Sequence, residues 1–319
     1  MRKLKGSVSR PPTTEEDKIA AIELVMNDIQ GKHGNVIAWM KDVAETEYLS
    51  SGIAELDEML MGGLPKGRIT EVFGAKSSGK TPMACQLVSQ SGVCLFVDAE
   101  HKMTGDLATK MHLPENTIRL RPNSLEEAFE DIEKYICLGI DSIVVDSLPA
   151  LPPLKESDNK DGTKIVGISP TAGFMSRRVP VLLRLLDEKN VTFVVVNQQR
   201  ANINAPAFGE QYHTFGGLAL ANYASVRIAV NRMAWLKHEK LGVYGLEIAM
   251  MLDKCNTGAK PRSGLSLPLV YDIGFVPNTE LADARKILIA EGKTVKPIAR
   301  ISDKATIVEE LSEMASDAV

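Results

Sequence analysis

The sequence predicts an α/β fold in which a mostly parallel, twisted sheet has helices on both of its faces. Three observations support this prediction. Short apolar runs alternate along the chain with segments of helical periodicity, which is typical of strand–helix–strand crossover units. The first of these runs leads directly into a glycine-rich loop, and the later ones end in polar clusters. In an open parallel sheet, such clusters meet at one edge and form the ligand site.

The composition indicates an ordinary soluble chain with a sizeable core. Of the 319 residues, 44% are hydrophobic and 24% are charged, and the net charge of −4 argues against a wholly basic nucleic-acid binder. The four cysteines lack C-x-x-C spacing, which favours buried, reduced thiols in the cytoplasm. No apolar run reaches the ~18 residues of a membrane span, and the basic N-terminus lacks the apolar core of a signal peptide. We therefore expect a cytoplasmic protein without a membrane partner.

The first predicted element is an N-terminal helix. Residues 1–12 are expected to be extended, and residues 13–16 have the pattern of a capping box. Four apolar residues then follow at helical spacing before Gly31, namely Ile19, Ile22, Met26 and Ile29. The narrow apolar face of this helix suits packing either on its own domain or on a neighbouring subunit, and the pattern does not choose between them.

A short helix and a turn are expected before the first strand of the sheet. The helix carries Leu56, Met59 and Leu60 and ends at the glycines of residues 62–63. A turn at residues 65–67 then leads into the apolar run of residues 69–73.

Residues 74–81 have the G-x-x-x-x-G-K-[ST] pattern of a phosphate-binding loop. Glycines at both ends allow the backbone to curl, so that successive N–H groups face a phosphate. Lys80 offers a positive charge to the outer phosphates, and Thr81 offers a hydroxyl to Mg²⁺. The strand before the loop and the helix expected after it argue against a chance match. The predicted nucleotide-binding residues are Gly74, Ala75, Lys76, Ser77, Ser78, Gly79, Lys80, Thr81 and Pro82.

Three further apolar runs are expected to be strands of the parallel sheet. They lie at residues 93–97, 143–145 and 192–196. Two helical patterns, at residues 125–138 and 179–186, occupy the intervals between them. This order predicts crossover connections and a mostly parallel sheet whose strands are buried on both faces.

The later part of the chain has a different pattern. The apolar runs at residues 226–230 and 246–252 lack long intervening helices, so we expect antiparallel strands that extend the sheet. From about residue 281 the pattern becomes helical, with one helix expected at residues 282–291 and a short acidic one at residues 307–314.

Polar residues follow each of the three later parallel strands. They occupy residues 98–101, 146–147 and 197–200. Because the carboxyl ends of parallel strands share one edge of the sheet with the loop at 74–81, these residues are expected to surround a bound nucleoside triphosphate.

Phosphoryl-transfer chemistry assigns a role to one residue of each cluster. Asp146 is placed to hold Mg²⁺ directly or through water, Glu100 to orient the attacking water, and Gln198 to detect the γ-phosphate. Two alternatives stay open at this point. Glu100 could cap a helix, and Gln198 could be an ordinary strand-end amide.

Two long polar segments, at residues 155–169 and 199–215, follow the predicted strands at residues 143–145 and 192–196. Loops of this length in a compact domain are usually functional or disordered. Their basic residues are interleaved with Asn, Gly and aromatic residues, which suits single-stranded nucleic acid but also fits solvated loops. The candidate DNA-binding residues in and beside them are Lys155, Lys160, Lys164, Ser176, Arg177, Arg178, Arg200, Asn202, Ile203, Phe208, Gly216 and Gly217.

Taken together, these residues resemble the RecA family of strand-exchange recombinases. The matching stretches lie in family order at residues 51–57, 63–74, 77–81, 96–101, 144–147, 197–200, 216–217 and 223–227. The combination of Asp-Ala-Glu-His at 98–101, Asn-Gln-x-Arg at 197–200 and Gly-Gly at 216–217 is typical of this family among phosphate-loop proteins. The diverged ends look like a phage-type or otherwise divergent member, which would act in a host cytoplasm if phage-encoded.

The resemblance implies a RecA-type phosphate-loop ATPase core with an N-terminal polymerisation helix and a small C-terminal α/β extension. The expected parts are an N-terminal lead and oligomerisation helix at residues 1–48, the ATPase core with its DNA-binding loops at 49–278, and a small C-terminal region at 279–319. In this family, the N-terminal helix packs on the neighbouring protomer.

The resemblance also implies an activity. It predicts a helical filament on single-stranded DNA that needs ATP and Mg²⁺, pairs with homologous double-stranded DNA and hydrolyses ATP to ADP and phosphate. It assigns Glu100 to water activation and Gln198 to γ-phosphate sensing, and the two long segments become the first and second DNA-binding loops. A lysine of the neighbouring protomer, Lys254 in this chain, is expected to reach the γ-phosphate.

Several family positions carry other residues here. Of the paired lysines that act on the neighbouring site, Lys254 is kept and Asn256 replaces the other. Leu107 and Thr104 stand where the family contacts adenine with tyrosine and aspartate, and Asn222 stands at the position of a filament-coupling phenylalanine. Two alternatives to a recombinase therefore stay open, namely a weakly hydrolysing mediator or filament protein and a hexameric helicase with the same core.

Overall fold

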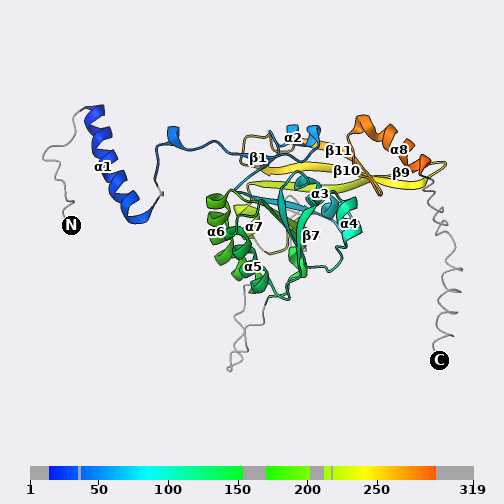
Figure 1. The fold of residues 1–319 in the computed structure, drawn as a ribbon, viewed down its shortest axis with the longest axis horizontal. Coiled ribbons are helices and arrows are strands. Elements are labelled where there is room, and N and C mark those ends of the chain that lie inside the picture. The colour runs from blue at the N-terminus through cyan, green and yellow to red at the C-terminus, as the bar shows by residue number, and fades with distance from the viewer. Residues whose placement is uncertain (1–13, 35–36, 154–169, 202–211, 217, 292–319) are drawn as a thin grey trace, which may run out of the picture. The chain divides into compact units, whose positions relative to one another are not determined.

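The computed structural model describes residues 14–34, 37–153, 170–201, 212–216 and 218–291 (Figure 1). The chain divides into two compact units, residues 1–46 and residues 47–319. None of the described helices is both long and apolar enough to cross a membrane. The predicted acidic helix at 307–314 lies outside the described residues.

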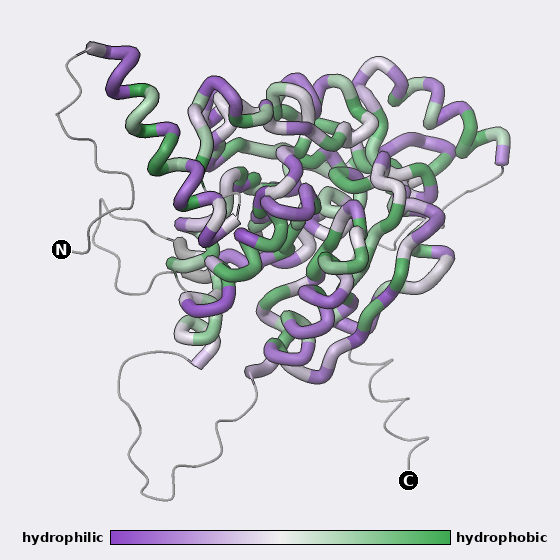
Figure 2. The backbone as a smooth tube through the Cα atoms, turned by 60° about the vertical axis from the view of Figure 1, so that its left-hand side comes forward, coloured by the Kyte–Doolittle hydropathy of each residue, from purple (hydrophilic) through white to green (hydrophobic). Residues whose placement is uncertain are grey.

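The first unit contains the helix α1 (Glu15–His33) and the short 3-10 helix η1 (Met40–Asp42). The capping box begins at Thr14, one residue later than predicted, because Thr14 exchanges hydrogen bonds with Asp17. Hydrophilic and hydrophobic residues alternate along the helix (Figure 2). No residue of α1 is buried, and Ile22 is 46% exposed. The predicted helix is confirmed, and the described residues of this unit leave its apolar side chains open to solvent.

The second unit is built on a ten-stranded sheet in the order β12-β11-β10-β9-β3-β7-β6-β4-β5, with β8 paired to β7. The strands are β3 (Ile69–Gly74), β4 (Val93–Asp98), β5 (Asn116–Leu120), β6 (Ser142–Asp146), β7 (Thr192–Ala201), β8 (Tyr212–Thr214), β9 (Val226–His238), β10 (Gly242–Cys255), β11 (Gly264–Val270) and β12 (Gly274–Phe275). A separate two-stranded sheet pairs β1 (Tyr48–Leu49) with β2 (Leu64–Pro65).

The direction of the strands confirms the predicted mostly parallel sheet with an antiparallel extension. The strands β5, β4, β6, β7, β3 and β9 are parallel to their neighbours. The strands β9, β10, β11 and β12 are antiparallel to one another, so β9 joins the two parts of the sheet. The runs at residues 226–230 and 246–252 are thus antiparallel to each other as predicted, although the first of them is parallel to β3.

Nine helical segments follow within the described part of the second unit. They are α2 (Ala54–Met59), α3 (Lys80–Leu87), α4 (Gly105–Lys110), α5 (Leu125–Cys137), η2 (Leu148–Ala150), α6 (Pro170–Lys189), α7 (Leu218–Tyr223), η3 (Asn278–Glu280) and α8 (Leu281–Ala290). The helix α6 is longer than the predicted segment at 179–186, because its first two turns also place Thr171 and Met175 in the core.

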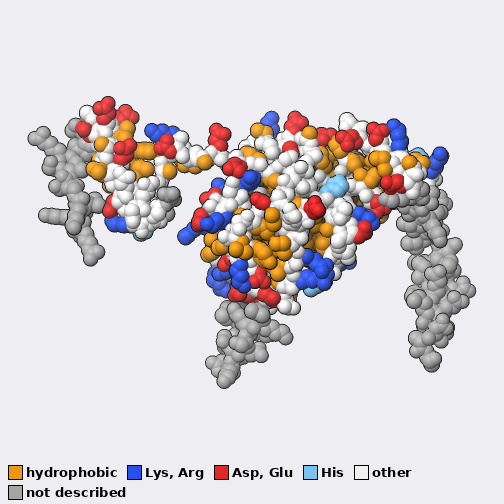
Figure 3. All heavy atoms as spheres, viewed as in Figure 1, with side chains coloured by type: hydrophobic (Ala, Val, Ile, Leu, Met, Phe, Trp, Pro, Cys, Tyr) orange, Lys and Arg blue, Asp and Glu red, His pale blue; other side chains and the backbone are white. Residues whose placement is uncertain are grey.

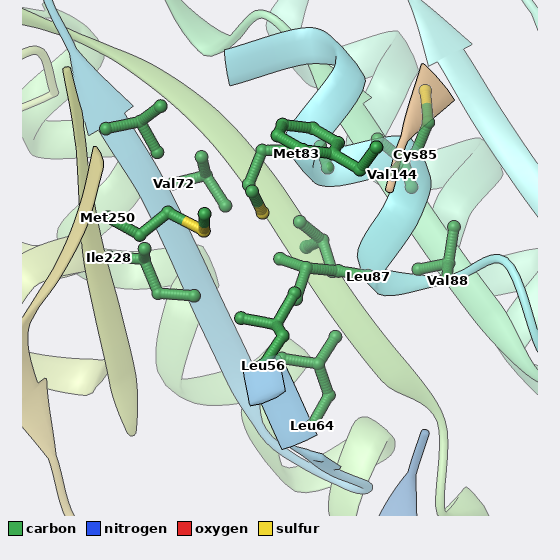
Figure 4. Packing of buried hydrophobic residues seen from close by; sticks show 14 of the residues in the cluster. Leu56, Leu64, Val72, Met83, Cys85, Leu87, Val88, Val144, Ile228 and Met250 are labelled. Carbon is green, nitrogen blue, oxygen red and sulfur yellow. The ribbon is translucent and has the colours of Figure 1, made fainter. Parts of the chain in front are cut away.

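Separate hydrophobic clusters cover the two faces of the sheet, which confirms helices on both sides. On one face, Leu56 of α2 and Met83 and Leu87 of α3 gather against β3, β9 and β10 (Figure 4). On the other face, α5, α6 and α7 pack together over the sheet (Figure 1). Successive side chains of β7 point to opposite faces of the sheet, since Val194 belongs to the first cluster and Val195 to the second.

The helix α8 packs against the far end of the antiparallel strands. Its buried residues Ala284 and Leu288 share a small hydrophobic cluster with Tyr244, Val270 and Val276. The described beginning of the predicted C-terminal region therefore shares a cluster with the sheet. The division into three parts at 48/49 and 278/279 stays a prediction.

Candidate functional site

The phosphate-binding loop connects β3 to α3 and packs beneath the antiparallel strands. A Cβ atom at Gly74 would lie 2.2 Å from the Val230 carbonyl oxygen, so no side chain fits there. Gly79 has a φ of +96° and would place a Cβ atom 2.9 Å from Ile248 Cδ1. Gly74 is thus required by close contact with β9, and Gly79 by its left-handed backbone conformation together with its contact with β10.

Lys80 begins α3, and its ammonium lies inside the loop. Its Nζ atom donates a hydrogen bond to the Ala75 carbonyl oxygen at 2.6 Å, and only 8% of the residue is exposed. Burial lowers the pKa of Lys80, whereas the carboxylates of Asp146 and Glu100 raise it. The loop therefore presents a desolvated positive charge next to two carboxylates.

Thr81 and Asp146 are hydrogen-bonded to each other at the edge of the sheet. Thr81 Oγ1 donates to Asp146 Oδ2 at 2.7 Å, and Asp146 is 8% exposed at the end of β6. Burial, with the negative charges of Glu100 and Asp98, raises the pKa of Asp146 to about 6, and the Thr81 hydrogen bond opposes this shift. A hydroxyl and a carboxylate are oxygen ligands of the kind that Mg²⁺ prefers, usually with substrate phosphates completing its shell.

The described residues contain no group of three or more His, Cys, Asp or Glu side chains that could hold a metal ion by themselves.

Glu100 lies in the turn after β4 and faces Asp146. Ser147 Oγ donates to Glu100 Oε1 at 2.8 Å, and Lys102 Nζ donates to Oε2 at 2.5 Å. The Lys102 hydrogen bond is the main cause that lowers the pKa of Glu100, and burial opposes it. Glu100 caps no helix, because α4 is capped by Thr104. The structure therefore excludes the alternative that Glu100 is a helix cap.

The carboxylate of Asp98 fixes this turn. Asp98 is 2% exposed, and it accepts hydrogen bonds from the backbone N–H groups of Lys102 at 2.9 Å and Met103 at 3.1 Å. The two backbone bonds hold the short segment that carries Glu100 in one conformation. The predicted cluster at 98–101 thus contains a positioning carboxylate as well as a cavity-facing one.

A single cavity of about 650 Å³ connects these residues. Lys76 to Pro82 line one side of it, together with Glu100, Asp146 and Gln198. Gln198 lies beside the loop because it pairs in register with Gly74 across β7 and β3. The structure therefore brings together the predicted loop, metal, water-activating and sensor residues from four separate strands.

The other end of the cavity is lined by Leu107, which stands at the adenine-contacting position that the resemblance implies, and by Tyr271, which was not predicted. Tyr271 lies in the turn between β11 and β12, and Leu107 faces the cavity from α4. Burial raises the pKa of Tyr271. Lys110 bridges Asp106 at 3.0 Å and Asp272 at 2.9 Å across the same end. No strand was predicted at β11, so nothing in the sequence pattern placed Tyr271 near the loop.

Lys254 does not reach the cavity of its own chain. The end of β10 pairs with the beginning of β9, where Cys255 lies opposite Val226, and Val226 pairs in turn with Thr70 near the start of β3. Lys254 is therefore at the sheet edge opposite the phosphate loop. Its Nζ atom donates to the carbonyl oxygens of Ala221 at 3.1 Å and Asn222 at 2.8 Å at the end of α7.

A polar network, fully buried at Glu71 and Asn197, runs from the Lys254 edge of the sheet to Gln198. Arg227 Nη1 donates to Asp253 Oδ2 at 2.5 Å, and its Nε atom donates to the fully buried Glu71 at 2.6 Å. Asn197 Nδ2 donates both to Glu71 Oε1 at 2.8 Å and to the Phe215 carbonyl oxygen at 2.9 Å. Asn197 thus fastens the chain at Phe215 to the strand that carries Gln198.

The segment at 199–215 is not a loop throughout, contrary to the prediction. Residues 199–201 continue β7 and pair with β8 in an antiparallel ribbon, where Gln199 lies opposite Thr214 and Arg200 opposite His213. The ribbon forms because backbone groups on both sides of the loop can pair with each other, which side-chain composition does not reveal. Gly216, with a φ of +90°, turns the chain at its end.

The candidate DNA-binding residues on α6 have separate environments. Ser176 Oγ donates to the Ala172 carbonyl oxygen at 2.8 Å within the helix, and Arg178 forms an ion pair with Glu133 of α5 at 2.5 Å. Arg177 is exposed. On the face shown in Figure 3, described basic and acidic side chains are interspersed. The remaining candidates lie outside the described residues or, for Arg200, have a side chain outside them: Lys155, Lys160, Lys164, Arg200, Asn202, Ile203, Phe208 and Gly217.

Comparison with known proteins agrees with the predicted resemblance. Residues 20–276 match the family model described as the RecA N-terminal domain. The chain is 38% identical over 279 residues to Protein RecA of Helicobacter pylori (strain P12), an alignment that covers 84% of this chain and 79% of that protein. It is 35% identical to Protein RecA of Wolinella succinogenes over the same shares of both chains.

Among solved structures, the crystal structure of the RadB recombinase is similar to this chain with a TM-score of 0.52. The match covers 71% of this chain and 98% of that chain at 20% sequence identity. At this identity the likeness concerns the fold alone.

Proposed function

This chain belongs to the RecA family of ATP-dependent DNA recombinases, and we propose how its residues carry out that activity. The observation that carries the proposal is the shared cavity. One sheet edge joins the phosphate loop, Glu100 and Gln198, and the strand that carries Gln198 continues directly into the second predicted DNA-binding loop. Occupation of the cavity and the conformation of that loop are therefore coupled through β7.

In the proposed reaction, the loop holds the ATP phosphates and water attacks the γ-phosphate. The backbone N–H groups of residues 74–81 and the Lys80 ammonium bind the phosphate oxygens. The water oxygen forms a bond to the γ-phosphorus, and the bond from phosphorus to the β–γ bridging oxygen breaks, its electron pair remaining on ADP. Glu100 accepts the proton that the water gives up. The products are ADP and phosphate.

Thr81 and Asp146 are the residues that would hold Mg²⁺. When bound, the ion would neutralise part of the negative charge on the phosphates. Their hydrogen bond, the burial of Asp146 and the oxygen chemistry of both groups support this assignment. The Thr81 hydroxyl would then turn its lone pairs toward the ion while Asp146 keeps its negative charge.

Gln198 and Asn197 would transmit the state of the γ-phosphate to the DNA-binding loop. Gln198 lines the cavity, and its backbone N–H donates to Asn197 Oδ1 at 2.8 Å. Asn197 in turn holds the Phe215 carbonyl oxygen, where the second loop returns to the core. A movement of Gln198 toward a γ-phosphate would therefore shift the anchor of the loop that is proposed to grip DNA.

Assembly of many copies along single-stranded DNA would complete the ATP site. Lys254 lies at the edge of the sheet opposite the cavity, so Lys254 of one copy can face the cavity of the next in a head-to-tail array. The open apolar face of α1 supports packing of that helix on another copy. Such an array would be a helical filament that pairs single-stranded with double-stranded DNA.

The deciding experiment combines ATP turnover with electron microscopy. The full chain is incubated with ATP and Mg²⁺, with and without single-stranded DNA, and filaments are imaged on the same DNA with a non-hydrolysable ATP analogue. We expect DNA-stimulated release of phosphate and helical filaments. DNA binding with negligible turnover would instead favour the mediator protein, and rings that unwind a forked duplex would favour the helicase.

A further inference from the structure

Lys102 is a lysine of the nucleotide cavity to which no role has yet been assigned. It lines the same cavity as residues 76–82, and its Nζ atom donates to Glu100 Oε2 at 2.5 Å. Its backbone N–H is fixed by Asp98 Oδ1 at 2.9 Å, whereas its side chain is 74% exposed. The backbone of Lys102 is thus anchored beside Glu100, while its ammonium has room to contact a ligand in the cavity.

The charges around Glu100 show where this ammonium lies. Glu100 and, more weakly, Asp146 raise the pKa of Lys102, and the charge of Lys80 also lowers the pKa of Glu100. Lys80, Lys102 and the Glu100 carboxylate thus line the same cavity, and Lys102 is hydrogen-bonded to that carboxylate. Both oxygens of Glu100 are engaged, one by Ser147 Oγ and the other by Lys102.

The exposed ion pair of Lys134 lacks this setting. Lys134 pairs with Asp131 at 2.8 Å and is 71% exposed, yet both residues lie within one turn of α5. A pair of that kind contributes little beyond local helix stability. Lys102 differs because its partner faces the phosphate-binding loop. An ammonium carries three donors, so the bond to Glu100 leaves two for phosphate oxygens.

We propose that Lys102 is a further catalytic residue, whose ammonium donates to a γ-phosphate oxygen of ATP while Glu100 holds it in place. The role rests on the proposed ATPase function. Lys102 keeps its protons throughout: the water oxygen bonds to the γ-phosphorus, the bond to the β–γ bridging oxygen breaks with its electron pair going to ADP, and the water proton passes to Glu100. Lys102 stabilises the negative charge on the equatorial oxygens of the transferring group.

The same ion pair could in principle slow hydrolysis, because a cation beside a general base weakens its affinity for a proton. Comparison of magnitudes decides between the two effects. A cation that contacts the transferring phosphoryl group raises turnover by ~10³–10⁵-fold in related phosphate-loop enzymes, whereas the whole contribution of a general base is ~10²–10⁴-fold. A partial change in the basicity of Glu100 is therefore the smaller effect, and Lys102 is expected to accelerate the reaction.

The test measures ATP turnover of the full chain with Mg²⁺ and single-stranded DNA. Lys102→Met removes the charge and keeps the length of the side chain, and Lys102→Arg keeps the charge. We expect Lys102→Met to lower kcat at least about 10-fold and Lys102→Arg to restore a substantial part of it. Lys134→Met is the matched control, because it removes a comparably exposed, ion-paired lysine outside the cavity.

Equilibrium binding of ADP separates this role from a structural one. ADP lacks the γ-phosphate, so Lys102→Met should bind ADP within about 2-fold of the wild-type chain while turnover falls. Unchanged or increased kcat in Lys102→Met would overturn the proposal, and so would an equal loss of ADP binding. A wild-type chain that fails to hydrolyse ATP would overturn the proposed function together with this role.

Discussion

The two parts of the ten-stranded sheet differ in how their strands are covered and in what they contribute to the cavity. The parallel strands β3, β4 and β6 are only 6, 6 and 5 residues long, and they lead to the loop, Glu100 and Asp146. Strand β7 is also parallel and largely buried, and it carries Gln198 beside the loop. The antiparallel strands β9 and β10 are 13 and 14 residues long and are buried mainly on one face. Their side of the cavity supplies Leu246, Leu269 and Tyr271.

The two parts of the sheet therefore have different roles at the cavity. The parallel strands bring charged and polar groups to one edge, because their carboxyl ends all point the same way. The antiparallel strands provide an apolar wall that packs closely on the phosphate loop, through the Val230 backbone at Gly74 and the Ile248 side chain at Gly79. Substitutions in the parallel part should therefore change turnover most strongly, and substitutions in the antiparallel part should change stability first.

The largest effect is expected at Glu100. Glu100→Gln keeps the shape of the side chain but removes the carboxylate that accepts the proton of water, so kcat should fall by ~10²–10⁴-fold. ATP binding should persist, because the phosphate loop is intact. Phosphate release and ATP-analogue binding measure the two quantities. The comparison variant is Lys80→Ala, which should also weaken ATP binding. If Glu100→Gln turned over ATP normally while Lys80→Ala did not, the assignment of Glu100 would be wrong.

The next effect concerns the antiparallel wall. Ile248 is fully buried and lies against Gly79, so Ile248→Ala should lower the free energy of unfolding by about 2–5 kcal/mol. Urea denaturation of the nucleotide-free chain measures this value. Met251 lies on the same strand and is 44% exposed, so Met251→Ala should cost less than about 1 kcal/mol. Equal losses in both variants would contradict the one-sided burial of β10.

Asp146 should show opposite effects on stability and turnover. Its pKa of about 6 in the folded chain lies above the ordinary value of 3.8, so its ionisation at neutral pH disfavours the folded state. Asp146→Asn should therefore raise the free energy of unfolding at pH 7.5 by about 1–3 kcal/mol without nucleotide or Mg²⁺. The same substitution should reduce Mg²⁺-dependent turnover.

The pH dependence of unfolding tests whether the charge of Asp146 causes the higher free energy of unfolding of Asp146→Asn. The wild-type chain becomes protonated at Asp146 as pH falls through 6, and the difference from Asp146→Asn should shrink until pH lies below 3.8. Unfolding curves at several pH values measure the difference. A gain that stays constant across this range would have another origin than the charge of Asp146.

The smallest effect is expected at the connection between the cavity and the second loop. Asn197→Ala removes the hydrogen bonds to Glu71 and to the Phe215 carbonyl oxygen. The ratio of DNA-stimulated to basal ATP turnover should fall about 5-fold, which corresponds to ~1 kcal/mol for one hydrogen bond. The control Ser266→Ala removes a side-chain hydrogen bond to Glu247 elsewhere on the sheet and should leave the ratio unchanged. An unaltered ratio in Asn197→Ala would show that Asn197 does not couple the cavity to the loop.

The strands that were predicted from the sequence are those that are most deeply buried. The strands β4, β6 and β7 contain uninterrupted apolar runs because they are buried on both faces, and β3, which carries the polar Thr70 and Glu71, leads directly into the phosphate-binding motif, so all four were predicted. Strand β5 is mostly exposed or half-buried, and β11 carries Ser266 and Pro268 among its apolar residues, so neither has a clear period. The ribbon of β7 and β8 depends on backbone pairing and was taken for a loop.

The sequence by itself determined the phosphate loop, the order of the parallel strands along the chain and the polar residues at their ends. These features are local, because a motif and the residue that follows a strand can be read without knowing what lies beside them. Tertiary structure decided which distant residues share the cavity. Tyr271 reaches it through an antiparallel hairpin, and Lys254 lies at the opposite edge because β10 reverses direction. Such contacts depend on strand order, direction and side-chain reach in space, and no spacing along the chain encodes them.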